Sequence, residues 1–261
     1  MGCNKQKYAI REISELTGVK PVTLRAWQRR YSLIQPERTD KGHRVYTQAH
    51  VEMIREIQGW LVKGVAIGKV KDLLGNPELA PDSEVIFHSL DQVEPVLTAL
   101  AELKSGKVDA LIAAIFKDYP LQQVESHFIE PIMEALVRVK GSSRSIQKAL
   151  FQSVMISRLS SIIESGNKVA NKGHTLVINL DYTGSIFAWL WCIKVAETGQ
   201  RVTMLDGVDD ATGLLDIEAV FDQMSLFSNR ALPEATKECI SQLKQSWGDH
   251  LVCSPMIEYL S

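Results

Sequence analysis

Apolar residues in the first quarter of the chain recur at helical spacing. They predict a first helix through Ile10, Ile13 and Leu16. Gly18 then supplies the tight turn that a helix C-terminus favours. Pro21 fits the first turn of a second helix, where its missing N–H costs no hydrogen bond. Leu24 and Trp27 form the expected inward stripe of this second helix.

A short alternating segment follows the second helix. Residues 38–46 contain the turn sequence Asp40-Lys41-Gly42 and predict a hairpin or wing. A third helix is expected from Thr47 or Gln48, with Val51, Ile54, Ile57 and Leu61 on one face. A break between Gly64 and Gly68 precedes a fourth helix, which ends near Leu74.

The middle of the chain has repeated helical spacing after a segment rich in helix breakers. Four helices joined by short turns at Ser105-Gly106, Asp118–Pro120 and Lys140–Ser143 predict a compact bundle. Their apolar faces are Val93, Val96, Leu97 and Leu100; Leu111, Ile112 and Ile115; Phe128, Ile132 and Leu136; and Leu150, Val154, Leu159 and Ile162.

The C-terminal part alternates strand and helix patterns. Strands are expected at 175–180, 201–205, 224–227 and 250–254, with helices at 185–197 and 233–247. This alternation predicts a parallel, doubly wound, Rossmann-like sheet, whose ligands bind at the C-terminal ends of the strands. The candidate ligand or partner cleft there contains Asp181, Thr183, Ser185, Trp189, Ser228 and Ser254. Trp189 and Trp191 lie on opposite sides of one helix, so at most one lines this cleft.

The fold class is therefore multidomain, α followed by α/β. A helix-turn-helix head with a wing is expected over residues 1–75 and a linker over 76–89. A four-helix bundle follows over 90–165, and the Rossmann-like domain covers 174–261.

Charge divides the chain in the same way. Residues 1–74 hold 14 Lys and Arg against 7 Asp and Glu, whereas the remainder holds 15 against 24. A basic head suits phosphate binding, and an acidic body is expected to sense, dimerise or contact other proteins. The longest apolar run, 186–193, is far shorter than the roughly 18 residues of a membrane span, so a cytoplasmic protein without membrane contact is expected. The four scattered cysteines have no zinc-ligand spacing.

The second helix and the hairpin carry the candidate DNA-binding residues. The helix is expected to present Thr23, Arg25, Gln28 and Arg29 outward, with Thr23 and Arg25 at base edges and Arg29 and Arg30 on phosphates. The hairpin adds Arg38, Lys41, His43, Arg44 and Tyr46. His43 is equally well explained as a residue that packs the hairpin, and Tyr46 is better explained as a packing residue with a polar tip. The alternative for the whole surface is an ordinary solvated helix face.

The order of these motifs resembles a known family. An isoleucine-rich helix, Gly-Val, Thr-Leu-Arg, Gly-His-Arg-Val-Tyr and a helix ending in Val-Lys-Asp-Leu-Leu are similar, over residues 8–74, to the DNA-binding domain of MerR-family transcription regulators. The sequence of residues 23–31, TLRAWQRRY, is closer to a subgroup that includes biofilm regulators and carries a cobalamin-binding-type domain. The resemblance implies a homodimer on double-stranded promoter DNA that activates RNA polymerase by untwisting an overlong promoter spacer.

The C-terminal part departs from the cobalamin signature of that subgroup. In Asp-x-His-x-x-Gly the histidine binds cobalt, but here Thr183 stands at its position and Ile186 at the glycine. Threonine cannot replace imidazole as this ligand. Cys253-Ser254 replaces a Gly-Gly pair, and Ser145, Ala149 and Leu150 replace a Trp-x-x-x-Glu-His element. The sequence therefore predicts a degenerate cobalamin-binding-type domain and no cofactor.

Catalytic and metal motifs are not found in the sequence. Without a P-loop, Gly-x-Gly-x-x-Gly or His-Glu-x-x-His motif, the chain is expected not to be an enzyme. His127 and Glu130 are better explained as a polar helix face, and Asp206, Asp209 and Asp210 as an acidic loop rather than a cation site. Two alternatives stay open: a small-molecule or corrinoid-linked sensor or enzyme with an attached DNA-binding head, and an adaptor whose acidic body binds a signalling protein.

Overall fold

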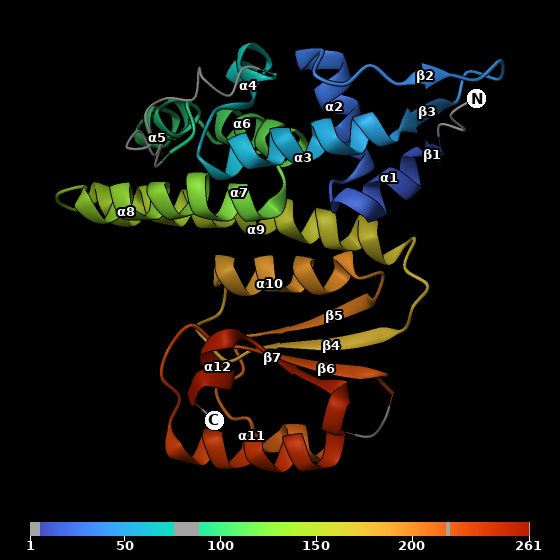
Figure 1. Ribbon diagram of the computed structural model, residues 1–261. Helices are drawn as coiled ribbons and strands as arrows, with labels where there is room; N and C mark the ends of the chain where they lie inside the picture. Colours follow the sequence, from blue (N-terminus) through green and yellow to red (C-terminus); the bar gives the residue numbers. More distant parts are fainter. Residues whose placement is uncertain (1–5, 76–88, 218–219, 261) are drawn as a thin grey trace. The chain divides into compact units, whose positions relative to one another are not determined.

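The computed structural model describes residues 6–75, 89–217 and 220–260, and the chain divides into two compact units, Met1–Leu150 and Phe151–Ser261 (Figure 1). The linker expected over 76–89 lies almost entirely outside the described residues. The finer division into head, bundle and sheet domain stays a prediction.

The first unit begins with the two expected helices, α1 (Ile10–Thr17) and α2 (Pro21–Tyr31). Gly18 follows α1 with φ of 70°, in the left-handed region, and its N–H donates to the carbonyl of Ser14 at 2.8 Å. Pro21 is the first residue of α2, as predicted. Two further helices, α3 (Gln48–Val62) and α4 (Ile67–Leu73), also follow the predicted pattern.

A small antiparallel sheet accompanies these helices. Its described strands are β1 (Lys7–Ala9), β2 (Glu37–Arg38) and β3 (Arg44–Thr47), in the order β1-β3-β2. The β2–β3 pair is the hairpin that the turn sequence around Gly42 predicts, whereas sequence reasoning missed β1. The sheet leads directly into α3, whose first turn is closed by the Thr47 N–H donating to His50 Nδ1 at 2.9 Å.

From residue 89 on, the first unit consists mainly of helices. It contains α5 (Val93–Ala101), α6 (Ser105–Asp118), α7 (Leu121–Val124), a π-helical segment η2 (Glu125–Ile129), α8 (Glu130–Arg138) and the start of α9 (Ser143–Asn167). The turn expected at Ser105-Gly106 is wrong, because both residues belong to the first turn of α6. The chain reverses just before them, where Leu103 adopts φ of 53°.

The second unit contains a parallel sheet. Within the described residues its strands are β4 (His174–Asn179), β5 (Arg201–Asp206), β6 (Gln223–Phe227) and β7 (Leu251–Cys253), in the order β5-β4-β6-β7. Helix α10 (Ile186–Glu197) covers one face and α11 (Glu234–Trp247) the other (Figure 1). Shorter helical segments are η3 (Thr212–Asp216), η4 (Gly248–His250) and α12 (Pro255–Leu260).

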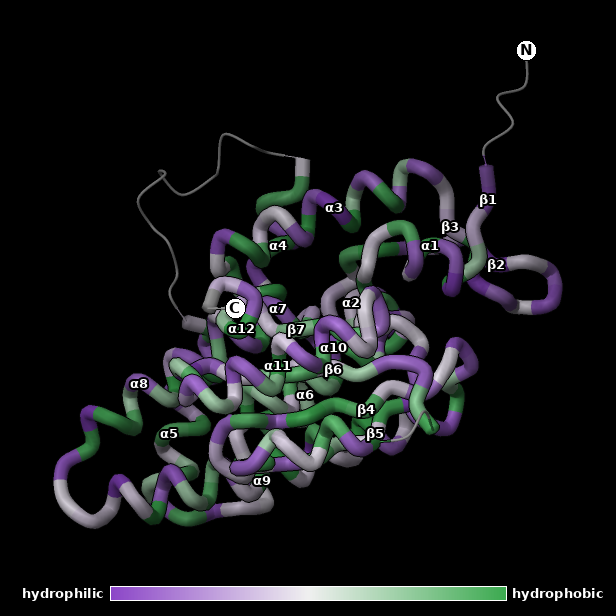
Figure 2. The backbone as a smooth tube through the Cα atoms, turned by 90° about the horizontal axis from the view of Figure 1, so that it is seen from below, coloured by the Kyte–Doolittle hydropathy of each residue, from purple (hydrophilic) through white to green (hydrophobic). Residues whose placement is uncertain are grey.

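Apolar side chains explain why these strands lie inside. Leu176, Ile178, Met224 and Leu226 are buried together with Ile240 and Leu243 of α11. In Figure 2, β4 is coloured as hydrophobic, whereas the loop between β2 and β3 is mostly hydrophilic. Among the helices of the described residues, none combines the length and the apolar character that crossing a membrane requires.

Candidate nucleic-acid interface and the sheet edge

Helix α2 has a buried side and a polar side. Leu24 and Trp27 are fully buried, in agreement with the predicted inward stripe. Arg25 and Gln28 are half-buried, and Arg29 and Arg30 are exposed. The polar side therefore presents cations and an amide group, the groups that recognise phosphates and base edges.

The hairpin is connected to this polar side by a side-chain hydrogen bond. Arg44 Nε on β3 donates to Gln28 Oε1 on α2 at 2.7 Å. Arg38 Nη1 donates to the carbonyl of Gly42 at 3.2 Å and so braces the hairpin turn. Lys41 and His43 lie exposed at that turn. The structure thus brings Gln28 and Arg44 together, whereas Lys41 and His43 at the turn face solvent.

Tyr46 belongs to strand β3 of the hairpin, and its side chain is buried. It is 1% exposed, and burial raises its pKa, against the nearby positive charges of Arg44 and Arg25, which lower it. Its hydroxyl is buried with no hydrogen-bond partner among the described residues. This burial agrees with the packing interpretation of Tyr46 rather than with an exposed DNA contact.

One expectation for α2 is wrong, and a second stays a prediction. The outward placement of Thr23 is wrong, since this residue is only 1% exposed. Arg30, expected on phosphate, is exposed, and its guanidinium pairs with Asp118 at the C-terminal end of α6. Helix α6 packs against α2, so a second side of α2 is covered.

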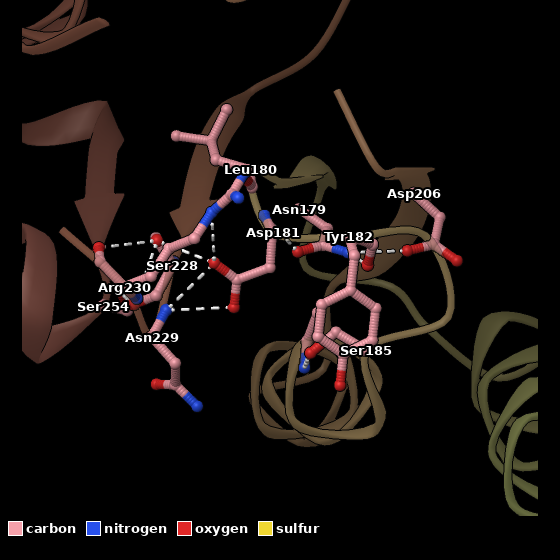
Figure 3. A network of polar contacts seen from close by, with 11 residues as sticks. Asn179, Leu180, Asp181, Tyr182, Ser185, Asp206, Ser228, Asn229, Arg230 and Ser254 are labelled. Atoms are coloured by element: carbon pink, nitrogen blue, oxygen red, sulfur yellow. Dashed lines mark hydrogen bonds and ion pairs between the residues drawn. The ribbon is translucent and has the colours of Figure 1, made fainter. Parts of the chain in front are cut away.

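A second polar cluster lies at the C-terminal edge of the parallel sheet. The strand order places β4 and β6 side by side although β5 comes between them in sequence, which makes the gap between their ends the topological switch point. Asp181 follows β4 and is 6% exposed. Its Oδ1 accepts from the Ser228 hydroxyl at 2.8 Å, and its Oδ2 accepts from the Asn229 N–H at 3.1 Å (Figure 3).

Residues that follow β6 and β7 add further contacts to this network. Arg230 Nη2 donates to the carbonyl of Leu180 at 2.9 Å, and its Nε lies 3.6 Å from Asp181 Oδ1. The Ser254 hydroxyl donates to the carbonyl of Ser228 at 3.0 Å (Figure 3). Three of the six predicted cleft residues therefore belong to one hydrogen-bond network: Asp181, Ser228 and Ser254.

The other three predicted residues lie on the β5 side. Trp189 Nε1 donates to Asp206 Oδ2 at 3.0 Å, and Asp206 Oδ1 accepts from the Asn179 amide at 2.7 Å. Ser185 caps α10 by accepting from the Ala188 N–H at 3.5 Å. Thr183 is exposed and packs on Gly207, whose hypothetical Cβ would lie 2.9 Å from the Thr183 backbone nitrogen. Sequence reasoning missed Asn179, which is buried and joins the two halves of the cluster.

Comparison with known proteins shows which proteins this chain is similar to. A family model for MerR HTH family regulatory proteins matches residues 8–76. The HTH-type transcriptional regulator MlrA of Escherichia coli (strain K12) is 34% identical over 201 residues, which is 76% of this chain and 79% of the relative. The HTH-type transcriptional repressor CarH of Myxococcus xanthus is 37% identical over 257 residues, 93% of this chain and 86% of the relative.

The chain belongs to the MerR family. It is a DNA-binding transcription regulator of the MlrA-like type. The relatives reported above carry names of transcriptional regulators, in line with a protein that is not an enzyme.

The sheet edge of this MerR-family chain does not fit a cobalamin. At the histidine position stands Thr183, which offers a hydroxyl and no imidazole. The carboxylate of Asp181, at the switch point, is committed to Ser228, Asn229 and Arg230 of the protein itself. Among the described residues no group of three or more His, Cys, Asp or Glu side chains is arranged to hold a metal ion.

Proposed function

We propose that this regulator reads duplex DNA with α2 in the major groove and the β2–β3 hairpin as a wing on the adjacent backbone. The observation that supports this most strongly is the 2.7 Å bond between Arg44 and Gln28, since it couples the hairpin to the polar side of α2. A helix and a wing with fixed relative positions can meet groove and backbone together.

Within this surface the roles divide by exposure and chemistry. Arg25 and Gln28, half-buried on α2, face base edges, where bidentate side chains give sequence preference. Arg29, Lys41 and His43 are exposed and contact phosphates, and Arg44 contributes its free terminal nitrogens to the same task. Arg38 holds the turn in shape through Gly42.

A binding experiment with the full chain tests this proposal. Genomic fragments selected by the wild-type protein are titrated against Arg25→Ala in a gel-shift assay, with random duplex as competitor. Arg25→Ala should lose most of the preference for the selected fragments over random duplex, by about 10-fold or more, because a good base contact contributes roughly 1–3 kcal/mol of discrimination. Arg138→Ala on α8, which removes an exposed arginine paired only with Glu134, is the matched control and should bind as wild type.

The family resemblance extends the proposal to a homodimer that activates transcription with RNA polymerase. Two identical readers require a twofold-symmetric site, so the footprint should be an inverted repeat. Transcription in vitro from promoters whose spacer is shortened one base pair at a time tests activation by untwisting. An activator of this kind loses its effect when the spacer already has the length that polymerase prefers.

The C-terminal unit serves as a sensory or interaction module without cobalamin and without catalysis. Its switch point is occupied by a hydrogen-bonded network rather than by free ligand groups, which supports this view. The input would then come from another small molecule or from a signalling protein that contacts the acidic body. Its test is capture from lysate by the full-length protein, followed by identification of the bound species.

A further inference from the structure

We propose that Asp118 is a positioning residue of the DNA reader: it fixes α2 against α6 and withholds Arg30 from DNA phosphates. The inference rests on the proposed function and concerns a residue outside the DNA-binding surface. Sequence reasoning assigned this position only to a turn.

Asp118 meets three side chains of α2. Arg30 Nη1 donates to both carboxylate oxygens, each at 2.9 Å, and the Tyr31 hydroxyl donates to Oδ2 at 2.8 Å. The carbonyl of the same residue accepts from the Trp27 indole at 2.7 Å. One residue at the end of α6 thus holds the last two turns of α2.

These partners lie on one face of α2. Trp27 and Arg30 follow Thr23 by four and seven residues, which is helical spacing along one side. Helix α6 packs against α2, and Thr23 on this side is buried. The face towards α6 is therefore distinct from the face that carries Arg25 and Gln28.

A second contact joins the end of α6 to α4. The Tyr119 hydroxyl, next to Asp118, accepts from the Ile67 N–H at the start of α4 at 3.1 Å. Tyr119 is 2% exposed. The end of α6 therefore engages both α2 and α4, and a roll of α2 about its axis would break the hydrogen bonds of Trp27, Arg30 and Tyr31 to Asp118.

The carboxylate competes directly with DNA for Arg30. A carboxylate and a phosphate offer a guanidinium the same charged oxygen acceptors. The Asp118 side chain is 7% exposed, whereas that of Arg30 is 47% exposed, so the arginine reaches inward from the surface to a partner already on the protein. Arg29, its neighbour in sequence, is exposed and provides the matched comparison.

The salt dependence of DNA binding tests the proposal. With the full chain and a random-sequence 30-base-pair duplex, each phosphate contact steepens the slope of log affinity against log salt by about 0.9. Arg29→Gln should flatten the slope by about that amount, and Arg30→Gln should leave it unchanged. Asp118→Asn, which retains the shape of the side chain, should steepen the slope by about 0.9, and adding Arg30→Gln should abolish this gain.

The outcomes separate the two proposals. If wild type binds DNA and Arg30→Gln flattens the slope as Arg29→Gln does, Arg30 is a phosphate contact and the role given to Asp118 is overturned. A weaker-binding Asp118→Asn with an unchanged slope and native circular dichroism also overturns it. If wild type shows no salt-dependent retention of duplex, the proposed function fails as well. Arg30→Gln alone decides the matter where Asp118→Asn does not fold.

Discussion

At the scale of single residues, Arg44 limits what Gln28 can recognise. Glutamine reads adenine by offering its oxygen and its NH₂ group together. The oxygen of Gln28 already accepts from Arg44 Nε, so one of its two acceptor lone pairs is engaged. Gln28 should then read adenine less well than a glutamine whose oxygen is free of this bond.

Arg44→Lys tests this limit because it keeps the charge and removes the Nε donor. Selection from randomised duplexes should show adenine enriched at the position facing Gln28, with only a small loss of affinity. Arg44→Ala should show the same enrichment with a larger loss, since a phosphate contact goes too. An unchanged base preference in both variants would show that the Arg44–Gln28 bond does not govern recognition.

Tyr46 is a buried phenol and Tyr31 a half-buried one, and they differ in hydrogen bonding. The hydroxyl of Tyr46 has no partner among the residues that the structure describes, whereas that of Tyr31 donates to Asp118. Tyr46→Phe should leave the free energy of unfolding unchanged or raise it by about 1 kcal/mol, because an unsatisfied buried hydroxyl is costly. Tyr31→Phe should lower it by about 1 kcal/mol. Urea unfolding measures both, and weakened DNA binding by Tyr46→Phe would contradict its role as a packing residue.

Local sequence patterns do not predict contacts between residues that lie far apart along the chain. Local spacing identifies Leu24 and Trp27 as inward residues, and both are buried. It cannot show that Asp118, 88 positions after Arg30, meets the same helix, so neither the ion pair of Arg30 nor the burial of Thr23 was predicted. Of the partners of Asp181, only Ser228 was named as a cleft residue, and the bond that joins the two was not predicted.

At the scale of elements, periodicity and breaker residues predicted most of what is observed. Helices α1 to α4 and the parallel strands occur where apolar spacing, Gly18 and Pro21 place them. Helix α9 shows the limit. Leu159 was predicted correctly, whereas the predicted Leu150, Val154 and Ile162 each lie one residue before a buried position. The buried positions are Phe151, Met155, Leu159 and Ile163. A long helix rich in apolar residues offers several stripes, and packing chooses among them.

Glycine substitutions test the loop that follows β5. Gly207 has φ of 81° and packs against the Thr183 backbone, while Gly248 has φ of 52° and open space around its Cα. Alanine at either position strains the backbone by roughly 1–2 kcal/mol. Gly207→Ala should cost more than Gly248→Ala, because the Thr183 backbone must also move. Thermal unfolding of both variants compares the losses, and equal losses would mean that this close approach is soft.

Tyr119 connects α6 to α4 in a way that depends on pH. Burial raises its pKa to about 12, and in an unfolded chain tyrosine titrates near 10. A raised pKa of this kind means that the stabilisation is complete below pH 10 and is lost as the pH rises from 10 to about 12. The urea midpoint should fall between pH 8 and pH 11, and fall less in Tyr119→Phe. An equal fall in both would assign the alkaline loss to other groups.

At the scale of the whole molecule, the chain combines a basic N-terminal part with an acidic body. The switch point of a doubly wound sheet is the usual place for a ligand. Here Asp181 at that point is bonded to Ser228, Asn229 and Arg230. We therefore expect the missing histidine to be only one of several features that separate this chain from a cobalamin sensor.

The hydrogen-bonded network around Asp181 leads us to expect that restoring the histidine alone does not restore cobalamin binding. Thr183→His restores the imidazole but leaves Asp181 committed to its three neighbours. After incubation with excess hydroxocobalamin and gel filtration, both wild type and Thr183→His should elute without corrin absorbance and with unchanged thermal midpoints, as should Thr183→Ala. A red Thr183→His fraction would mean that the missing histidine alone prevents cobalamin binding by the wild-type chain. The closed network around Asp181 would then be its consequence rather than an independent barrier.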